Sequence, residues 1–421
     1  MRHENFEYKN GILFCENVNL TELARVFGTP FYVYSKKSMV ERYRDFEKAF
    51  EDIPHQIHYA VKSNSNINII KLFYSLGAGL DVNSGGELYR ALQAGANPEK
   101  ILFTGVGKTD EEILMGLRHN IFLFKIESLQ ELEVLNELAR KENKVAIIAI
   151  RINPNVDPKT HPYITTGLYE SKFGIDQDSA VEAFKIASKL PNLKILGIDM
   201  HIGSQITEVS AFREAVILMN ELIEKLRMEG IEINHFDVGG GLGVQYNDEQ
   251  VPDVFEYANA IKDELEKSKC KIIFEPGRYL TADAGALVTK TLYVKNHRDK
   301  NFLIVDAAVN DLMRPAFYNA YHHILPVKQT DREKIVYDIV GPACETGDFF
   351  AKGREFYKTE RNELIAIMSA GAYGFCMSSN YNSRRRVPEI LVDDDKFYLI
   401  RQRETFEDLI KVEKIIDEIF T

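Results

Sequence analysis

The sequence has few cysteines, no surplus of positive charge and no long apolar run. Its four cysteines (Cys15, Cys270, Cys344 and Cys376) lie far apart without metal-type spacing, which indicates a reducing compartment and no disulfide framework. A net charge of −11 argues against nucleic acid or an anionic membrane surface as the main partner. The longest apolar runs, such as VAIIAI at 145–150, are far too short to span a bilayer.

The N-terminal segment MRHENFEYKN also lacks the apolar core that a secretory signal requires. Together with the cysteine pattern, this absence predicts a cytoplasmic protein. The chain of 421 residues is too long for one ordinary domain and suggests two. Because 45% of the residues are hydrophobic, there is ample material for two cores.

Eight short apolar runs alternate with amphipathic stretches between about residues 56 and 277. The runs are 56–61, 78–82, 100–104, 121–126, 145–152, 194–202, 233–239 and 271–277. The stretches 84–95, 128–143 and 209–230 carry apolar residues three and four positions apart, as helices do. This alternation predicts a (β/α)8 barrel. A doubly wound open sheet is the alternative, but it requires a glycine fingerprint after the first strand, where Lys62 stands instead.

Both ends of the chain are rich in strand-like runs without long helices between them. The opening segment FEYKNGILFCENV reads as a hairpin around Asn10 and Gly11, and similar runs follow residue 283. The pattern therefore predicts an α/β chain with a second, all-β domain that is sandwich-like or Greek-key-like. The predicted parts are a barrel at 36–283, a β-domain made of 1–35 and 284–421, and a closing amphipathic helix at 405–420.

Polar residues follow the predicted barrel strands at their carboxyl ends, where barrel enzymes place reactive groups. These strand tips carry Lys62, Asp81, Arg151, His201, the glycine run 239–243 and the EPGR segment 275–278. Alone, a strand-end lysine is usually solvated, a histidine is usually structural, and a glycine-rich turn is often only a tight turn. Their convergence on one rim predicts a common site.

Pyridoxal phosphate would use this whole set. It needs a lysine amine to hold its aldehyde as a Schiff base, and a carboxylate near its pyridine nitrogen. We assign these roles to Lys62 and Glu275. The phosphate needs backbone N–H groups free of side chains, and an imidazole can stack on the ring. The residues predicted for these contacts are Gly239, Gly240, Gly241, Gly277 and His201.

The segments YAVKSN, HIGSQ, GGGLG and EPGR resemble the barrel motifs of the fold-type III, alanine-racemase-like pyridoxal phosphate decarboxylases. Three later segments narrow the resemblance to the diaminopimelate decarboxylase family: MRPAFYNAYH (313–322), GPACETGD (341–348) and GAYGFCMSSNYNSRRRVPEILV (371–392). The similarity runs nearly end to end. Thr346 stands where the family more often has serine.

The resemblance implies decarboxylation of meso-2,6-diaminopimelate to L-lysine and carbon dioxide, the last step of lysine biosynthesis. It implies that Lys62 and Cys344 are catalytic, with Cys344 as the proton donor. The predicted cofactor contacts are Lys62, His201, Ser204, Gly239, Gly240, Gly241, Glu275, Gly277, Arg278 and Tyr373, to which the reading of the strand tips adds Asp81 and Arg151. The implied substrate contacts are Arg278, Arg314, Tyr318, Glu345 and Tyr373. The resemblance also implies a homodimer with shared active sites, in which Cys344 and Glu345 serve the partner's barrel.

The charge pattern agrees with this substrate. Diaminopimelate ends in a second ammonium–carboxylate pair, so its binding site needs a guanidinium for the carboxylate and an acid for the ammonium. Ornithine ends in an ammonium, so its site needs only carboxylates. Arg278 and Arg314 with Glu345 supply that mixed set. Three other functions stay open: a decarboxylase of ornithine, arginine or carboxynorspermidine, an amino acid racemase, and a non-catalytic homologue. The last would be expected to lack Lys62, Glu275 or Cys344, all of which are present.

Two further motifs are assigned no chemistry. His322 and His323 resemble a metal-binding pair, but no third ligand is evident nearby in the sequence, so no metal is predicted. The arginine run 384–386 is interpreted as a solvated or inter-domain feature.

Overall fold

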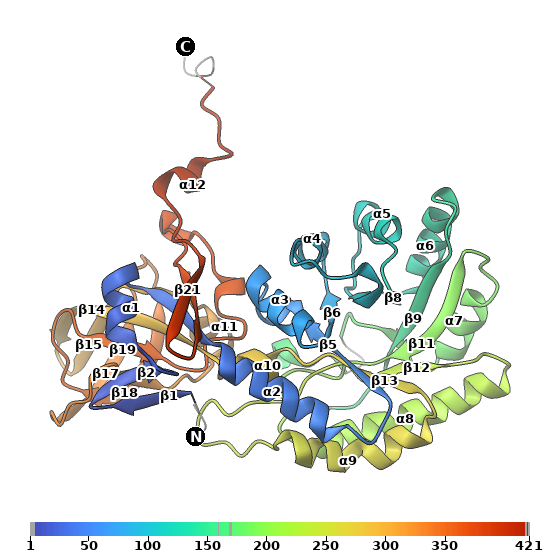
Figure 1. Cartoon of the computed structure of the whole chain (residues 1–421), viewed down its shortest axis with the longest axis horizontal. Coiled ribbons are helices and arrows are strands. Elements are labelled where there is room, and N and C mark those ends of the chain that lie inside the picture. Colours follow the sequence, from blue (N-terminus) through green and yellow to red (C-terminus); the bar gives the residue numbers. More distant parts are fainter. Residues whose placement is uncertain (1–4, 159, 168–170, 417–418, 420–421) are drawn as a thin grey trace. The chain divides into compact units, whose positions relative to one another are not determined.

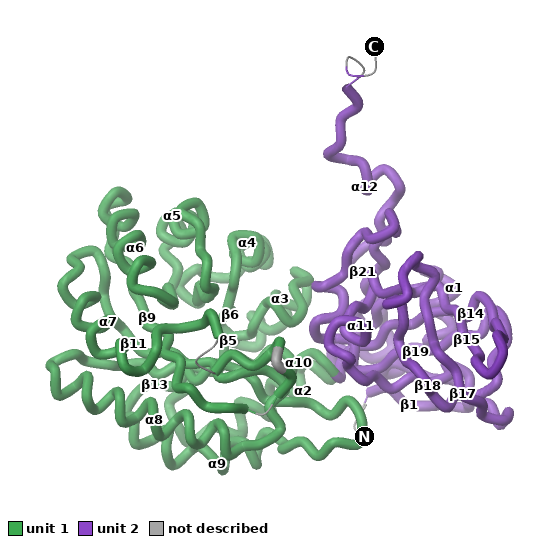
Figure 2. Tube along the Cα trace, turned by 180° about the vertical axis from the view of Figure 1, so that it is seen from behind, with its two compact units in different colours: residues 1, 38–282 green, residues 2–37, 283–421 purple. Residues whose placement is uncertain are grey.

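The computed structural model describes residues 5–158, 160–167, 171–416 and 419. The chain forms two compact units, which Figure 2 shows in different colours. One comprises residues 38–282 and is called the barrel unit below. The other comprises the described residues from 5 to 37 together with those from 283 onward, and is called the β unit.

Eight parallel strands close the barrel (Figure 1). They are β5 (His55–Ala60), β6 (Gly79–Val82), β7 (Ile101–Phe103), β8 (Leu123–Ile126), β9 (Ala146–Asn153), β11 (Leu193–Asp199), β12 (His235–Asp237) and β13 (Lys271–Phe274). Each strand pairs with the next, β8 pairs with β9, and β13 pairs back with β5. The short strand β10 (Ile175–Asp176) adds to β9. This closure excludes the open-sheet alternative.

Helices follow most of the barrel strands. Those of the barrel are α2 (Lys36–Ala49), α3 (Ile67–Ser75), α4 (Gly85–Gln93), α5 (Asp110–His119), α6 (Leu129–Lys141), α7 (Ala180–Ala187), α8 (Val209–Met228), α9 (Val254–Lys267) and α10 (Arg278–Thr281). Short 3-10 turns are η1 (Val61–Ser63), η2 (Pro98–Lys100) and η3 (Pro162–Ile164). Ser84 and Ser128 cap α4 and α6 by accepting backbone N–H bonds. Gly95 and Gly230 follow α4 and α8 with positive φ, the conformation that ends a helix most easily in glycine.

The β unit is built around a mixed sheet in the order β18-β17-β15-β14-β4-β20-β21, with β19 pairing to β14 and β16. The strands are β4 (Phe31–Ser35), β14 (Gly285–His297), β15 (Lys300–Val305), β16 (Ile324–Pro326), β17 (Lys334–Val340), β18 (Phe349–Tyr357), β19 (Leu364–Ile367), β20 (Glu389–Asp393) and β21 (Lys396–Arg401). Strand β4 comes from the N-terminal part of the chain and pairs with both β14 and β20. Segments from both ends of the chain therefore build one sheet.

A three-stranded sheet of β1 (Phe6–Lys9), β2 (Ile12–Cys15) and β3 (Val18–Asn19) completes the strands of this unit. Its first turn is the predicted hairpin, in which Asn10 and Gly11 both have positive φ. The helices are α1 (Leu20–Phe27), α11 (Arg314–Tyr318) and α12 (Phe406–Ile410), with the turns η4 (Phe375–Met377) and η5 (Tyr381–Ser383). Residues of β2, β4, β14 and β20 share one buried apolar core.

The predicted barrel and strand-rich second unit are confirmed. Strands β10, β16 and β18 lie outside the runs that the sequence indicated, and β3 overlaps its run only at Val18. The closing helix predicted at 405–420 is wrong over most of its described length, because α12 ends at Ile410 and residues 411–416 are not helical. Phe406, Ile410 and Val412 are 67%, 61% and 91% exposed, so no packed apolar face stabilises a longer helix.

Among the described residues, no helix is both long enough and apolar enough to cross a membrane.

Candidate active site

Lys62 lies immediately beyond the first barrel strand. Strand β5 ends at Ala60, and the chain turns through η1, in which Val61 and Ser63 are buried. Lys62 points the other way, with 36% of its side chain exposed and its Nζ 3.9 Å from Oδ2 of Asp81. The strand end therefore places a primary amine at the barrel mouth, as the sequence predicts.

Asp81 holds a fixed carboxylate beside this amine. It lies on β6 and is fully buried. Thr104 donates its hydroxyl to Oδ1 over 2.5 Å, and the Asn83 side chain donates to Oδ2 over 3.4 Å. Because a buried carboxylate is costly without partners, these contacts keep Asp81 in one position facing Lys62.

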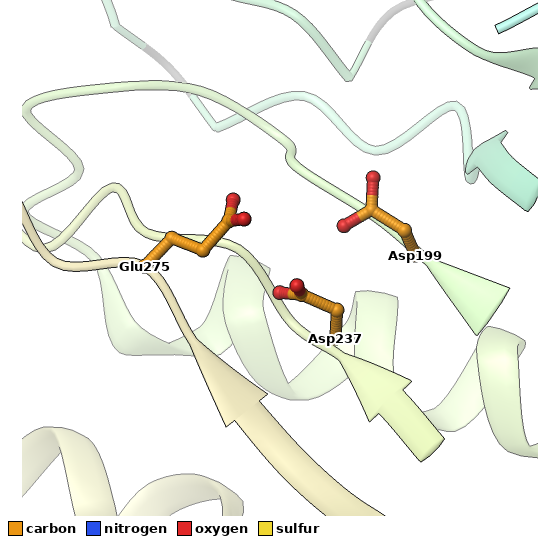
Figure 3. A group of neighbouring side chains, drawn as sticks. All are labelled: Asp199, Asp237 and Glu275. Atoms are coloured by element: carbon orange, nitrogen blue, oxygen red, sulfur yellow. The ribbon is translucent and has the colours of Figure 1, made fainter. Parts of the chain in front are cut away.

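Glu275 belongs to a cluster of three buried carboxylates. Figure 3 shows Asp199, Asp237 and Glu275, from the ends of β11, β12 and β13, with their carboxylates turned toward one another. The ammonium of Lys125, a fully buried residue of β8, lies among them. Its Nζ is 2.8 Å from Asp199 Oδ1 and 2.6 Å from Asp237 Oδ2, and it donates a short hydrogen bond to Glu275 Oε1.

This cluster has unusual protonation behaviour. Burial raises the pKa of Asp237 to about 7, and burial together with the charge of Asp237 raises the pKa of Glu275 well above its usual range. For Lys125, burial alone would lower the pKa, but attraction to the carboxylates of Asp199, Asp237 and Glu275 outweighs it and raises the pKa. Lys125 therefore stays charged. Asp237 and Glu275 keep their protons to a higher pH than exposed carboxyl groups do.

Arg151 of β9 stands beside the cluster. Its Nη1 donates to Glu127 Oε1 over 2.9 Å, and its Nε lies 3.9 Å from Asp199 Oδ2. The guanidinium stacks over the ring of Phe173 at 4.8 Å. It also donates to the backbone carbonyl of His201 over 3.4 Å. Arg151 thus links the charged cluster to the segment that carries the predicted stacking residue.

His201 follows β11 and is held as a neutral ring. Burial, helped by the positive charges of Lys62 and Arg151, lowers its pKa well below the usual range. The amide of Gly240 donates to its Nδ1 over 3.2 Å, so that nitrogen is an acceptor and the ring proton is on Nε2. A neutral, oriented imidazole is suited to stacking on an aromatic cofactor.

The glycine run after β12 leaves no room for side chains. A Cβ on Gly239, Gly240 or Gly241 would lie 2.6, 2.2 or 2.5 Å from a backbone carbonyl oxygen. Gly239 and Gly241 also have positive φ. The amides of Gly239 and Gly240 already donate to Asp237 and His201. Among the described residues, the amide of Gly241 meets no acceptor, so it is the member of this run that is available to a phosphate.

Ser204, Gly277 and Arg278 converge near this run. Arg278 is buried and donates to the Ser204 hydroxyl over 3.0 Å and to the Tyr246 hydroxyl over 2.9 Å. A Cβ on Gly277 would lie 3.0 Å from the Cβ atoms of Ala60 and Ser63. The structure therefore brings together the predicted residues of the barrel unit, from Lys62 to Arg278.

The β unit carries the other predicted residues. Arg314 begins α11 and is buried, while Tyr318 ends the same helix and is half-buried. Nη1 of Arg314 lies 3.0 Å from Nε2 of His322, and Nδ1 of His322 lies 2.8 Å from the carbonyl of Met368. A guanidinium only donates, so Nε2 accepts and Nδ1 carries the proton. His322 thus orients Arg314, and its two nitrogens have ordinary protein partners rather than a metal.

Cys344 and Glu345 lie in an exposed loop before β18. Asp348 is buried and anchors this loop by accepting the amides of Val309 and Ala343 over 2.7 and 2.6 Å. Cys344 itself is exposed. Oε2 of Glu345 accepts the hydroxyl of Tyr381 over 2.9 Å. The loop therefore has a firm base and a solvent-facing tip.

Two further features of the β unit concern earlier predictions. Tyr373 has a φ of 55°, a strained value for a non-glycine residue and one that is common at functional sites. Arg384, in the arginine run, donates to Asn310 Oδ1 over 2.9 Å and lies 3.7 Å from Asp311 Oδ2. It is therefore tied within the β unit rather than solvated.

Sequence reasoning missed Lys125, Asp199 and Asp237. A signal was present, because each is a charged residue inside or at the end of an apolar barrel strand, as Lys62 is. Nothing in the sequence says that their side chains meet. In the described part of the chain, the three carboxylates around Lys125 are also the one group with the spacing of metal ligands, but the ammonium occupies the space between them.

Comparison with known proteins agrees with this geometry. Residues 36–282 match the family model described as the pyridoxal binding domain of pyridoxal-dependent decarboxylases. The diaminopimelate decarboxylase of Aquifex aeolicus is 52% identical over 406 residues, covering 96% of both chains. That of Vibrio cholerae is 48% identical over 415 residues, covering 98% of this chain and 99% of the relative.

Solved structures of high similarity carry the same description. The diaminopimelate decarboxylase of M. jannaschii in complex with L-lysine has a TM-score of 0.94 and 40% identity, covering 99% of both chains. The Helicobacter pylori enzyme complexed with L-lysine has a TM-score of 0.91 and 41% identity, covering 94% of this chain and 99% of that one. The chain belongs to the diaminopimelate decarboxylase family of pyridoxal-dependent decarboxylases.

Proposed function

We infer that this protein removes one carboxylate from meso-2,6-diaminopimelate, with pyridoxal phosphate as cofactor, and releases L-lysine and carbon dioxide. The observation that carries this conclusion is the near full-length similarity to diaminopimelate decarboxylases, two of which were solved with L-lysine. The barrel mouth supports it with an amine, buried carboxylates and a glycine run on one rim.

The residues of the barrel unit fit the cofactor. Close packing excludes side chains at Gly239, Gly240 and Gly241, and the amide of Gly241, which meets no acceptor among the described residues, is left for a phosphate. Lys62 would hold the aldehyde carbon, and Glu275 would face the ring nitrogen. Bound pyridoxal phosphate supplies an electron sink for the electron pair of the bond to the departing carboxylate.

The remaining cofactor contacts are assigned by the same reasoning. The neutral ring of His201 would stack on the cofactor, and Asp81 would hold Lys62 in place until the aldehyde arrives. Ser204, Gly277, Arg278 and Tyr373 would complete the phosphate and ring contacts. Arg151 would act through the backbone of His201, to which it donates.

Substrate recognition is assigned to charged residues of opposite sign. Arg314 would read the distal carboxylate, because a guanidinium can bond both carboxylate oxygens at once. Glu345 would receive the distal ammonium, while Tyr318 and Arg278 would border the substrate. Cys344 would donate a proton to the carbon that lost carbon dioxide, and its thiol would regain that proton from water.

The test is a carbon dioxide assay with the purified holoprotein. Meso-diaminopimelate, ornithine, arginine and lysine are supplied in parallel, and the amino acid products are identified. Release of carbon dioxide with equimolar lysine from diaminopimelate alone supports the proposal. Faster release from another substrate would reassign the specificity, and stereochemical inversion without carbon dioxide would make the protein a racemase.

We also propose that the partner of this chain is a second copy, with each active site shared between two chains. Decarboxylation needs a site closed to stray water, and Cys344 and Glu345 lie on a solvent-facing loop tip that suits such a cover. An isologous dimer would bring the loop of one copy to the barrel of the other.

Complementation between two inactive variants tests this sharing. Lys62→Ala and Cys344→Ala are mixed under conditions that exchange subunits. A mixed dimer then has one site with both residues intact, so activity should return to as much as about half per mixed dimer by two-fold symmetry. No recovery despite proven exchange would mean that Cys344 serves its own chain.

A further inference from the structure

Lys125 is a fully buried lysine for which the decarboxylation scheme has no use. It lies on β8, within the run IFLFKI, with 0% of its side chain exposed. A buried ammonium is costly unless charged partners surround it. Its partners, Asp199, Asp237 and Glu275, come from three consecutive strands across the barrel interior (Figure 3).

The Lys125 ammonium and the carboxyl groups of Asp199, Asp237 and Glu275 form a cluster that is called the tripod below. A lysine ammonium has three N–H donors, and three carboxylate oxygens surround Lys125, one from each partner. Glu275 contributes only Oε1 to this arrangement. In the described part of the chain, Oε2 of Glu275 accepts no hydrogen bond. One oxygen of Glu275 is therefore fixed by Lys125, and the other is left for a ligand at the barrel mouth.

The charges around the tripod do not balance. Lys125 has one ammonium against three carboxyl groups, and Asp81 on strand β6 adds a fourth buried acid whose charge also acts on Lys125 and Glu275. Arg151 lies 3.9 Å from Asp199, but its close partner is Glu127 at 2.9 Å. Because these buried acids outnumber the nearby cations, burial and mutual repulsion raise the pKa values of Asp237 and Glu275. A further cation beside Oε2 of Glu275 would be stabilised, because it would favour the ionised carboxylates.

We propose that Lys125 is a positioning residue, which holds Glu275 so that its free oxygen and the surplus negative charge of the tripod keep the cofactor's ring nitrogen protonated. This inference rests on the proposed function, since it assumes that Glu275 faces that nitrogen. Lys125 touches neither cofactor nor substrate in this scheme. It acts only through the orientation and ionisation of Glu275.

The test compares Lys125→Met with the wild-type protein. The apoproteins are titrated with pyridoxal phosphate, and the protonation of the ring nitrogen is followed against pH by NMR of cofactor labelled at that atom. We expect at least a tenfold weaker cofactor affinity and loss of the ring proton at lower pH. Glu275→Gln should shift the ring nitrogen in the same direction.

A matched control is Lys108→Met. Lys108 is another buried lysine of the barrel unit, with 2% of its side chain exposed and Glu131 at 2.7 Å. It also donates to the backbone carbonyl of Lys125 over 2.7 Å, so it reports what a disturbed backbone alone does. Wild-type affinity and ring protonation in Lys108→Met, with changes in Lys125→Met, support the proposal. Equal changes in both would overturn it.

Two other outcomes also overturn the proposal. One is unchanged affinity and ring protonation in folded Lys125→Met. The other is a ring nitrogen that stays protonated to higher pH, because Lys125 would then merely repel positive charge from the ring. If Lys125→Met does not fold, Lys125→Met combined with Asp199→Asn removes one charge of each sign and carries the same expectations.

The readouts separate this inference from the proposed function. They need only the cofactor, so absence of carbon dioxide release from diaminopimelate leaves them interpretable. If Glu275→Gln itself leaves the ring nitrogen unaffected, the assignment of Glu275 fails. If Glu275→Gln has its effect and Lys125→Met has none, only the role of Lys125 fails.

Discussion

The predicted site residues of the two units, each unit taken by itself, lie in different surroundings. In the barrel unit, Asp81 and Glu275 are buried and connected to other charged or polar side chains. Among the predicted site residues of the β unit, Cys344 and Glu345 are exposed on a loop, Tyr318 and Tyr373 are half-buried, and Arg314 is buried. If the proposed assignments hold, the barrel unit carries a preorganised cofactor platform and the β unit carries a more exposed set of groups for the substrate and the proton transfer.

The physical reason lies in what each group must do. A cofactor ring needs charges that do not reorganise, and buried networks supply them at a cost in desolvation. A substrate must enter and leave, so its contacts belong on accessible loops. Changes in the barrel unit should therefore act on chemistry, and changes in the β unit, apart from Cys344 as the proposed proton donor, should act mainly on substrate affinity.

The largest effect is expected for Lys62→Ala. Without the amine, decarboxylation should fall at least about a thousandfold, because the covalent attachment of the cofactor is lost. Carbon dioxide release measures the loss, and borohydride reduction of the wild-type holoprotein should fix the cofactor on Lys62, as read by mass spectrometry. Lys71→Ala, an exposed lysine of α3, is the control. An adduct on another lysine would contradict the assignment.

Next in size is Glu275→Gln. The amide can still meet Lys125 but cannot hold the ring nitrogen protonated, so kcat should fall about a hundredfold or more, as when one preorganised electrostatic contact is removed. Glu264→Gln, a buried glutamate of α9, should keep its activity. Full activity of Glu275→Gln would show that the charge of the ring is set elsewhere.

A smaller effect is expected in the β unit for Arg314→Met. Losing a charge-assisted contact worth about 1.5–3 kcal/mol should raise KM for diaminopimelate about tenfold to a hundredfold, with a lesser change in kcat. His322→Leu should shift KM in the same direction by less, since it only orients Arg314. Arg332→Met, a partly exposed arginine paired with Glu363, is the control. Equal loss with ornithine would mean that Arg314 does not read the distal carboxylate.

The smallest effect is expected for Tyr381→Phe, which removes the hydroxyl that bonds Glu345. A single hydrogen bond is worth about 0.5–1.5 kcal/mol, so KM should rise about twofold to tenfold while cofactor affinity stays unchanged. Tyr398→Phe, on β21, serves as the control because it is similarly exposed. A change in cofactor affinity without a change in KM would contradict the assignment of Tyr381 and Glu345 to substrate binding rather than to cofactor binding.

Much of the barrel side of the site follows from local sequence pattern. Apolar runs at regular spacing predicted the eight strands, and reading the polar residues at the carboxyl end of each run led to Lys62, Asp81, His201 and Glu275. This works because parallel strands of a barrel bring their carboxyl ends to one rim whatever the intervening helices contain. The strand-rich β unit followed from the same kind of pattern.

Other features depend on distant parts of the chain. The C-terminal segment has helical spacing of apolar residues, yet α12 stops at Ile410 because no surface of the described chain packs against it. The glycine run predicted free amide donors. Only the folded structure shows that the amides of Gly239 and Gly240 already donate hydrogen bonds to Asp237 and His201.

By itself, the sequence determined the barrel, the strand-rich second unit, the family and the amine at the first strand tip, because these depend on local periodicity and short motifs. Only the tertiary structure decided that Lys125 stands among Asp199, Asp237 and Glu275, and that His322 orients Arg314. The partners of Lys125 lie 74 to 150 residues from it in the chain. Charges so distant in sequence meet only when the sheet closes, and no local pattern encodes their distances.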